Sequence, residues 1–288
     1  MVLRGAAYRT YVRPQPRQFT PATIVNAPVN GVYSATLGNP DLKPYSATSL
    51  DLSLEWYNRP NGLVSLAAFQ KRITGLITQI SDRKLLCPSD LSVYGIQNTG
   101  TFSVVGDQCQ SDVNDPVTKQ PLQFAASGFV NQDRPVTLRG LEFNVQQTLD
   151  FLPGMLSHLG GGFNYAYTKI SGTNANGTKA TLPGVSKHNA NVIGYYETDD
   201  YGLRLVFNMR SKYDLASAGT FTGAARSVKA RGQLDLSASY NVTKAFTVSF
   251  DAYNLTNAIR QEYENDTRLS RRADYDGRTY TLTGRLNF

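Results

Sequence analysis

The sequence predicts an all-β protein, namely an antiparallel transmembrane β-barrel. Apolar and polar residues alternate with period two in about ten segments. Each segment is roughly as long as the 9–11 residues that a tilted strand needs to cross a bilayer. Short turns and long loops alternate between the segments, which is typical of outer-membrane barrels. No uninterrupted apolar run approaches the roughly 18 residues of a membrane-spanning helix, so a membrane-embedded form of the chain must be a closed sheet.

The last nine residues, 280–288, form the clearest of these segments. One face of the extended chain carries apolar residues and a glycine, namely Tyr280, Leu282, Gly284, Leu286 and Phe288. Threonine, arginine and asparagine occupy the other face, so one side suits hydrocarbon and the other suits water. The residues Tyr280, Leu282, Leu286 and Phe288 resemble the C-terminal signal by which bacterial outer-membrane proteins are recognised for insertion. This resemblance implies the barrel-assembly machinery as a partner.

The remaining strands and the loops follow from the same alternation. We expect strands at about 3–13, 50–57, 63–73, 138–151, 159–170, 187–198, 203–209, 233–240 and 246–253. Long external loops are expected at about 14–47, 81–135, 171–186, 214–230 and 258–277, and the second of these is expected to be irregular. Short turns of such barrels face the periplasm, which places the C-terminus there.

Composition narrows the class of protein further. The chain of 288 residues contains 17 Tyr and 13 Phe, which suits the aromatic girdles of a barrel. Its net charge is +7, but the basic residues are dispersed and no nucleic-acid-binding module accompanies them. We therefore expect outer-membrane lipid, and no nucleic acid, as a partner.

Few residues carry recognisable chemistry. Cys87 and Cys109 lie in one external loop, and because an outer-membrane protein folds in an oxidising compartment we expect a disulfide between them. No catalytic, metal-binding or cofactor motif is present, so neither an enzyme nor a cofactor is expected. Basic residues concentrate in the last external loop, where we expect contact with an anionic ligand or with lipopolysaccharide phosphates. These residues are Arg260, Arg268, Arg271 and Arg272.

Several segments together resemble the C-terminal part of TonB-dependent outer-membrane receptors, in the branch found in Xanthomonas- and Caulobacter-type bacteria. The most specific is Gly-Asn-Pro-Asp-Leu-Lys-Pro at 38–44 followed by the strand at 49–57, although Tyr45 stands where many members have Glu. Weaker matches lie at 3–14, 138–142, 182–188 and 254–257. The resemblance implies the last ten strands of a barrel of about 22 strands. The signal peptide, TonB box, plug domain and other strands of such a receptor are then expected outside residues 1–288.

The resemblance also implies a function. We expect a segment of a Gram-negative outer-membrane receptor for TonB-energised uptake of a scarce substrate, of the carbohydrate or iron-chelate class. The TonB complex would act through the absent N-terminus, and this chain alone is not expected to transport. One alternative is a complete ten-stranded barrel that acts as a porin, an adhesin or an outer-membrane enzyme. A second alternative is a soluble all-β carbohydrate-binding protein.

Overall fold

The computed structural model describes residues 1–20, 24–80, 86–173, 179–218 and 225–288. These residues form 20 strands in three sheets, a four-residue helix α1 (Pro16–Phe19) and two short 3-10 turns, η1 (Ser92–Tyr94) and η2 (Gly154–His158). In this part of the chain, none of the helices has the length and apolarity needed to span a membrane. The predicted all-β fold class is confirmed.

The largest sheet contains the ten predicted barrel strands. Its strands follow one another in chain order, and each pairs antiparallel with the next. They are β1 (Val2–Val12), β4 (Tyr45–Arg59), β5 (Gly62–Thr74), β10 (Val136–Thr148), β11 (Leu159–Ser171), β12 (His188–Glu197), β13 (Tyr201–Arg210), β16 (Arg231–Asn241), β17 (Phe246–Tyr253) and β20 (Thr279–Leu286). All ten lie within a few residues of their predicted positions.

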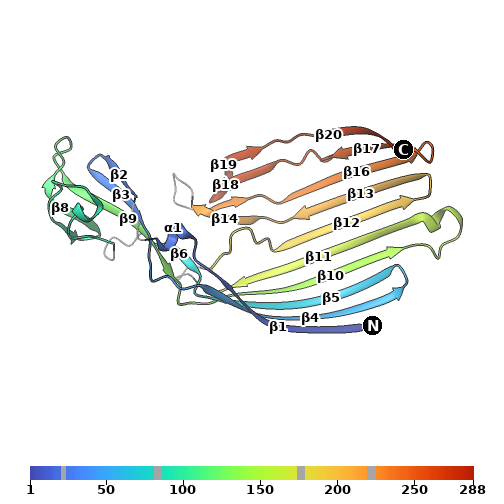
Figure 1. The fold of residues 1–288 in the computed structure, drawn as a ribbon, viewed down its shortest axis with the longest axis horizontal. Coiled ribbons are helices and arrows are strands. Elements are labelled where there is room, and N and C mark those ends of the chain that lie inside the picture. The colour runs from blue at the N-terminus through green and yellow to red at the C-terminus, as the bar shows by residue number, and fades with distance from the viewer. Residues whose placement is uncertain (21–23, 81–85, 174–178, 219–224) are drawn as a thin grey trace.

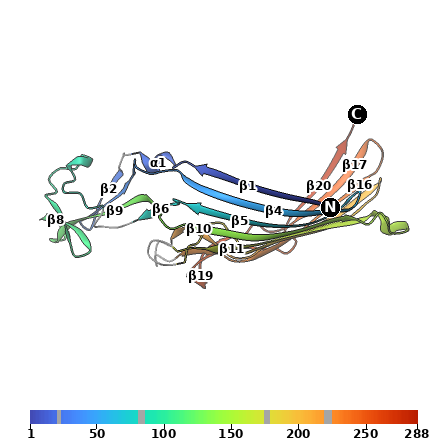
Figure 2. The same ribbon diagram turned by 90° about the horizontal axis from the view of Figure 1, so that it is seen from below.

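This sheet is curved and open. In Figures 1 and 2, β1 and β20 form its two edges, and both chain termini lie at the end of the sheet that carries the short turns. Among the described strands, β1 pairs only with β4 and β20 pairs only with β17. The long connections all leave from the opposite end, which we call the loop end.

The two faces of the sheet differ in polarity, as the alternation predicts. Residues directly opposite on neighbouring strands share a face, so apolar residues meet apolar ones, as in the pair Phe250 and Leu282. The intervening pair Asp251 and Thr281 lies on the other face. Large side chains on the apolar face are uncovered, and the exposed fraction reaches 55% for Leu52 and 75% for Leu282. This face lacks the protein cover that a soluble fold would give it.

A second sheet of six strands occupies the connections after β1 and β5. It contains β2 (Ile24–Val29), β3 (Val32–Leu37), β6 (Ile77–Ile80), β7 (Phe102–Val105), β8 (Gln108–Asn114) and β9 (Pro121–Asn131). In Figure 1 it projects beyond the loop end of the main sheet. The prediction that the loop at 81–135 is irregular is therefore wrong where β7, β8 and β9 form. Residues 81–85 lie outside the described residues.

The main buried apolar cluster lies in this second sheet, where side chains of β9 alternate between buried and half-buried positions. The cluster comprises Ala35, Leu91, Phe102, Cys109, Leu122, Phe124 and Ala126. The sulfurs of Cys87 and Cys109 are bonded to each other, and Cys109 is only 1% exposed. The loop sheet thus has a core of its own.

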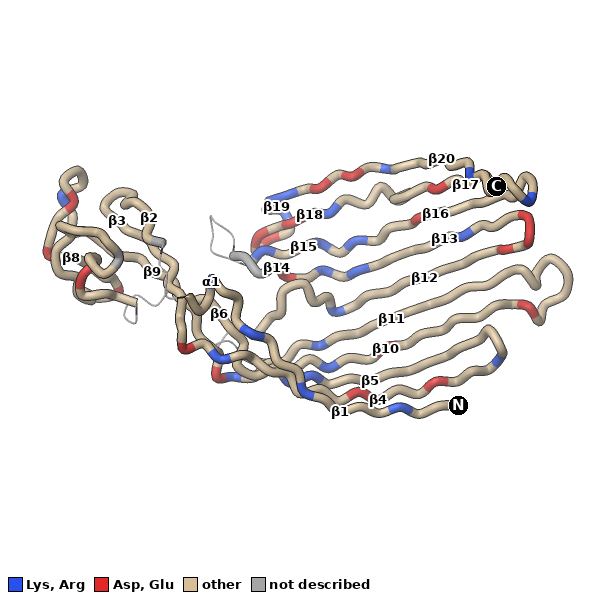
Figure 3. The backbone as a smooth tube through the Cα atoms, in the orientation of Figure 1, with Lys and Arg blue, Asp and Glu red and all other residues tan. Residues whose placement is uncertain are grey.

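A third sheet of four strands extends the loop end near β13, β16 and β17. It consists of β14 (Tyr213–Ala218), β15 (Ala225–Val228), β18 (Arg260–Glu264) and β19 (Asp266–Asp274). Figure 3 shows acidic and basic residues interleaved on β18 and β19. The predicted loops at 214–230 and 258–277 therefore contain strands that pair with each other.

Candidate ligand-binding site

A row of carboxamide side chains crosses the polar face of the main sheet. The register places five such residues directly opposite one another on β10, β11, β12, β13 and β16, namely Asn144, Asn164, Asn191, Asn208 and Gln233. Each amide offers both a donor and an acceptor. The sequence shows only that each position is polar, because lateral alignment depends on strand register.

A hollow of about 370 Å³ opens beside this amide row, toward the loop end. Asn191, Asn208 and Gln233 border it, and basic residues close its other side. The polar and charged residues that line it are Asn189, Asn191, Asn208, Arg210, Lys229, Arg231, Gln233 and Arg260. Strands β12, β13, β16 and β18 supply most of them, so the hollow joins the main sheet to the four-stranded sheet.

Three cations at this hollow carry uncompensated charge. The Nε of Arg210 donates to Ser186 Oγ at 2.6 Å, and its guanidinium lies 3.8 Å from the ring centroid of Tyr213. The Nη2 of Arg231 donates to Gln233 Oε1 at 2.7 Å, whereas its buried Nε has no hydrogen-bond partner among the described residues. No ion pair between described residues involves Arg210, Lys229 or Arg231. The hollow is therefore electropositive.

The four arginines predicted to contact an anion are each bonded to a carboxylate of the four-stranded sheet. Arg260 Nη1 lies 2.6 Å from Glu262 Oε1 and 2.8 Å from Asp274 Oδ2. Arg272 Nε lies 2.6 Å from Asp274 Oδ1. Arg271 Nε likewise lies 2.6 Å from Glu264 Oε2, and Arg268 Nη2 lies 2.8 Å from Asp266 Oδ2. Their contact with an anionic ligand stays a prediction, and Arg260 alone borders the hollow.

This ion-pair network keeps its members charged. Hydrogen bonds from Arg272 and then Arg260 hold the pKa of the Asp274 carboxyl below its usual value. Bonds to Asp274 and Glu262 raise the pKa of the Arg260 guanidinium in turn. Glu262 is only 3% exposed and also bonds Arg226, so its buried charge lies between two guanidinium groups. The network fastens β15, β18 and β19 together.

The residues of the predicted insertion signal lie on the apolar face of the edge strand β20 or just after it. The exposed fraction is 58% for Tyr280, 75% for Leu282 and 55% for Leu286. Phe288 follows the strand and is fully exposed. Their role in insertion stays a prediction. In the described residues, no cluster of three or more His, Cys, Asp or Glu is arranged to hold a metal ion.

Comparison with models of protein families matches residues 1–255 to the β-barrel of TonB dependent receptor-like proteins. The chain belongs to the TonB-dependent receptor family. Receptors of this family work with TonB and lie in the outer membrane of Gram-negative bacteria, so the apolar face of this receptor barrel faces lipid. In outer-membrane barrels the polar face lines the lumen and the long loops are external.

Solved structures show the same fold. The siderophore receptor PirA from Acinetobacter baumannii is 17% identical with a TM-score of 0.64, and the match covers 99% of this chain and 39% of PirA. A variant of the ferric enterobactin receptor PfeA from Pseudomonas aeruginosa is 15% identical with a TM-score of 0.65, covering 99% and 38%. The copper transporter OprC is 15% identical with a TM-score of 0.59, covering 99% and 37%. Comparison with curated proteins gave no match.

The coverage shows how much of a whole receptor chain residues 1–288 represent. It spans less than two fifths of the length of the solved receptors that it matches. Ten open strands are consistent with part of a larger barrel, because a sheet with two free edges leaves backbone groups unpaired in lipid.

Proposed function

We propose that this chain is the C-terminal part of the barrel of a receptor for TonB-energised uptake of a scarce ligand, of the carbohydrate or iron-chelate class. Family membership supports the receptor role. The plug domain would occupy the lumen against the polar face, and TonB would act through the N-terminal part of the receptor. This chain then supplies wall and external loops and does not transport alone.

The electropositive hollow at the external mouth of the barrel is the main observation that supports an anionic, oxygen-rich ligand. Arg210, Lys229 and Arg231 attract anions there, and the amide row continues from the hollow along the lumen wall. Amides donate to and accept from oxygen-rich groups, and guanidinium groups bind carboxylates well. A ligand with negative charge and many oxygen atoms fits both features. A sugar acid or an anionic metal chelate has this chemistry.

A complete ten-stranded barrel is the weaker alternative. Closure would require β1 to pair with β20, and the described strands show no such pairing. The uncovered apolar face likewise speaks against the soluble carbohydrate-binding alternative.

Uptake by cells that produce the receptor containing this chain tests the proposal. The probes are a ferric citrate chelate, a ferric catecholate chelate, a uronic-acid oligosaccharide and a neutral oligosaccharide. We expect energised uptake of at least one anionic probe, and we expect Arg210→Gln with Arg231→Gln to lower it about tenfold or more, since a bond to a charged partner is worth roughly 1.5–3 kcal/mol.

Arg204→Gln is the matched control. Arg204 lies on the same strand and face as Arg210 but is paired with Glu197 near the periplasmic turns, so uptake should stay unchanged. Energised uptake of the neutral probe alone, unaffected by the double substitution, would contradict the anionic ligand class. Uptake of no probe in a TonB-dependent manner would contradict the receptor role.

A further inference from the structure

Basic residues gather on the lipid-facing side of β1, β4, β5, β10 and β11, near their external ends. The register places Arg9, Thr48 and Arg72 in one lateral row. The next row toward the periplasm contains Leu50, Gln70, Arg139 and Lys169. Both rows share a face with Leu52 and Leu141, which are uncovered and apolar, because side chains two residues apart point the same way. The cations therefore face lipid at the external boundary of the apolar band.

No carboxylate balances these charges. The three acidic residues of the five strands, Asp51, Glu55 and Glu142, all lie on the lumen face. Arg139 Nε donates to Gln70 Oε1 at 2.7 Å and Arg9 Nη2 donates to Ser46 Oγ at 3.1 Å, so their polar partners are neutral. None of the ion pairs between described residues includes Arg9, Arg72, Arg139 or Lys169.

The pair Arg139 and Lys169 is the feature that most favours an anion-binding site. The two residues are direct cross-strand partners, and like charges in that position repel each other. An anion bound between them would remove the repulsion. Repulsion between exposed charges in water is weakened by solvent, but at the edge of a bilayer the nearby hydrocarbon strengthens it.

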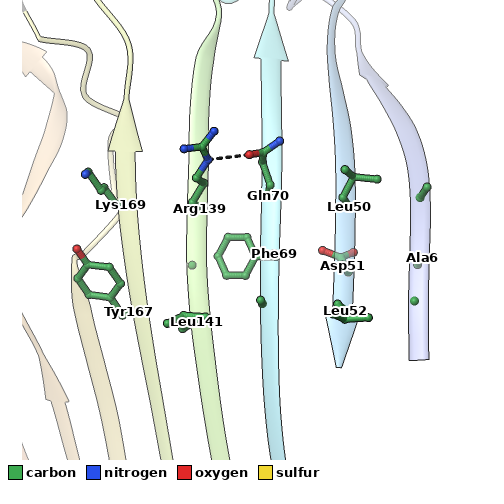
Figure 4. A pocket seen from close by; sticks show the side chains of 14 residues that line it. Ala6, Leu50, Asp51, Leu52, Phe69, Gln70, Arg139, Leu141, Tyr167 and Lys169 are labelled. Carbon is green, nitrogen blue, oxygen red and sulfur yellow. Dashed lines mark hydrogen bonds between the residues drawn. The ribbon is translucent and has the colours of Figure 1, made fainter. Parts of the chain in front are cut away.

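An apolar groove begins directly below this pair. It has a volume of about 780 Å³. Its floor includes the small residue Ala68, which lies between the larger Leu52 and Leu141, and the small residues Gly5 and Ala7 of β1, which lie on the other side of Leu52. Figure 4 shows Arg139 and Lys169 at the external end of the groove, with Leu141 and Tyr167 beneath them. The cationic pair Arg139 and Lys169 and the apolar groove therefore form one continuous surface.

We propose that this surface binds a phosphorylated acyl lipid of the outer leaflet, with the phosphate between Arg139 and Lys169 and an acyl chain in the groove. Arg9 and Arg72 lie one row further out, where they would meet additional headgroup oxygens. Charge complementarity selects the phosphate, and the groove selects a lipid over a soluble anion. The site lies on the outside of the barrel and is separate from the lumen site for the imported ligand.

Native mass spectrometry of the detergent-solubilised receptor that contains this chain tests the site. The probes are a bisphosphorylated hexa-acyl glucosamine disaccharide lipid, the same lipid after dephosphorylation, and inorganic pyrophosphate. We expect the phosphorylated lipid to bind most tightly. Arg139→Gln with Lys169→Gln should weaken it about 30-fold, from the usual contribution of two basic residues near an anionic membrane surface.

Two further variants keep the result interpretable. Lys71→Gln removes a cation from the lumen face of β5, the strand next to β10, and should leave lipid binding unchanged. Ala68→Leu fills the groove without touching a charge and should weaken the lipid several-fold but not pyrophosphate. A heat-modifiable gel shift reports folding of every variant.

Three outcomes overturn the proposal. They are unchanged lipid binding in the double variant, an equal loss in Lys71→Gln, and binding of pyrophosphate or of the dephosphorylated lipid as tight as that of the phosphorylated lipid.

Discussion

Gly140 lies on the lumen face of β10 beneath the ring of Phe69. A Cβ atom added at Gly140 would lie 2.3 Å from Phe69 Cζ and 2.7 Å from the carbonyl oxygen of Tyr167. The ring can turn away but the carbonyl belongs to the neighbouring strand, so Gly140→Ala should destabilise the barrel by about 1–3 kcal/mol. The temperature at which the heat-modifiable gel band is lost measures this.

Gly5→Ala provides the control for that substitution. The Cβ atom of an alanine at Gly5 would meet nothing closer than 3.9 Å, so its unfolding temperature should match that of the unchanged protein. Adding Phe69→Ala to Gly140→Ala should restore part of the loss, because it removes the ring but not the carbonyl. An unchanged unfolding temperature for Gly140→Ala would contradict this prediction, because it would mean that β10 and β11 accommodate the added methyl group without a loss of stability.

Asp274 gives the four-stranded sheet a defined dependence on pH. Its pKa in the folded protein is lowered by Arg272 and Arg260, so its stabilising contribution is present above the unfolded pKa of about 3.9. That contribution is lost as pH falls through the folded pKa. We expect amide hydrogen exchange in β18 and β19, corrected for intrinsic rates, to quicken below about pH 4.

Asp274→Asn should flatten this dependence by removing the titrating group. Asp276→Asn removes a nearby exposed carboxylate that takes part in no ion pair between described residues, and it should leave the profile as it is. Equal profiles for the unchanged protein and for Asp274→Asn would assign the acid sensitivity to other groups.

At the scale of single residues, the sequence predicted which face of the sheet a side chain lies on, but it did not predict which side chains are neighbours across strands. Alternation assigned Tyr280 and Leu282 to the apolar side and the threonines between and after them to the polar side, because the side-chain period of a strand is two. It gave no register, so the amide row and the opposed pair of Arg139 and Lys169 were not predictable. The carboxylates on the facing strand that pair with Arg260 and Arg271, namely Asp274 and Glu264, were also missed, since the pairing of β18 with β19 creates these contacts.

Among the elements, the six-stranded loop sheet depends on the disulfide between Cys87 and Cys109. The bond joins residues 22 apart, and Cys109 packs in the buried cluster beside Phe102 and Phe124. Replacing both cysteines by serine should destabilise this sheet by about 3 kcal/mol, the usual effect of a closed loop of that length. Hydrogen exchange should quicken in β7, β8 and β9 and stay slow in β10 and β11.

Reduction of the disulfide in the unchanged protein should cause the same faster exchange as the double substitution, and it serves as the check on that variant. Faster exchange throughout the ten-stranded sheet would instead mean that the loop sheet and the barrel unfold together. Among the described residues no strand of the loop sheet pairs with a strand of the ten-stranded sheet, which favours separate opening of the two sheets.

Element prediction succeeded where a strand crosses the membrane and failed where it does not. Membrane strands such as β4, which has 15 residues, alternate apolar and polar residues over a long stretch, here Leu50 to Trp56, so the pattern is long enough to recognise. Strands β7 and β15 have four residues each, and so short a segment shows little periodicity. Within the loop predicted to be irregular at 81–135, strand β7 was missed for this reason, whereas β9 has 11 residues and its length does not explain why it was missed.

For the whole molecule, the two open edges of the ten-stranded sheet predict how residues 1–288 behave in isolation. Backbone groups along β1 and β20 have no partner strand on one side, which lipid does not tolerate. Residues 1–288 refolded alone should therefore give no heat-modifiable monomer, whereas the receptor that contains them should give one. Paired cysteines at Ala6→Cys and Thr283→Cys, both on the lumen face of the edge strands, should not crosslink within one receptor. A stable monomer with an efficient crosslink would mean that ten strands close on themselves. In a larger barrel, β1 and β20 each pair with a strand outside residues 1–288, and the two edges never meet.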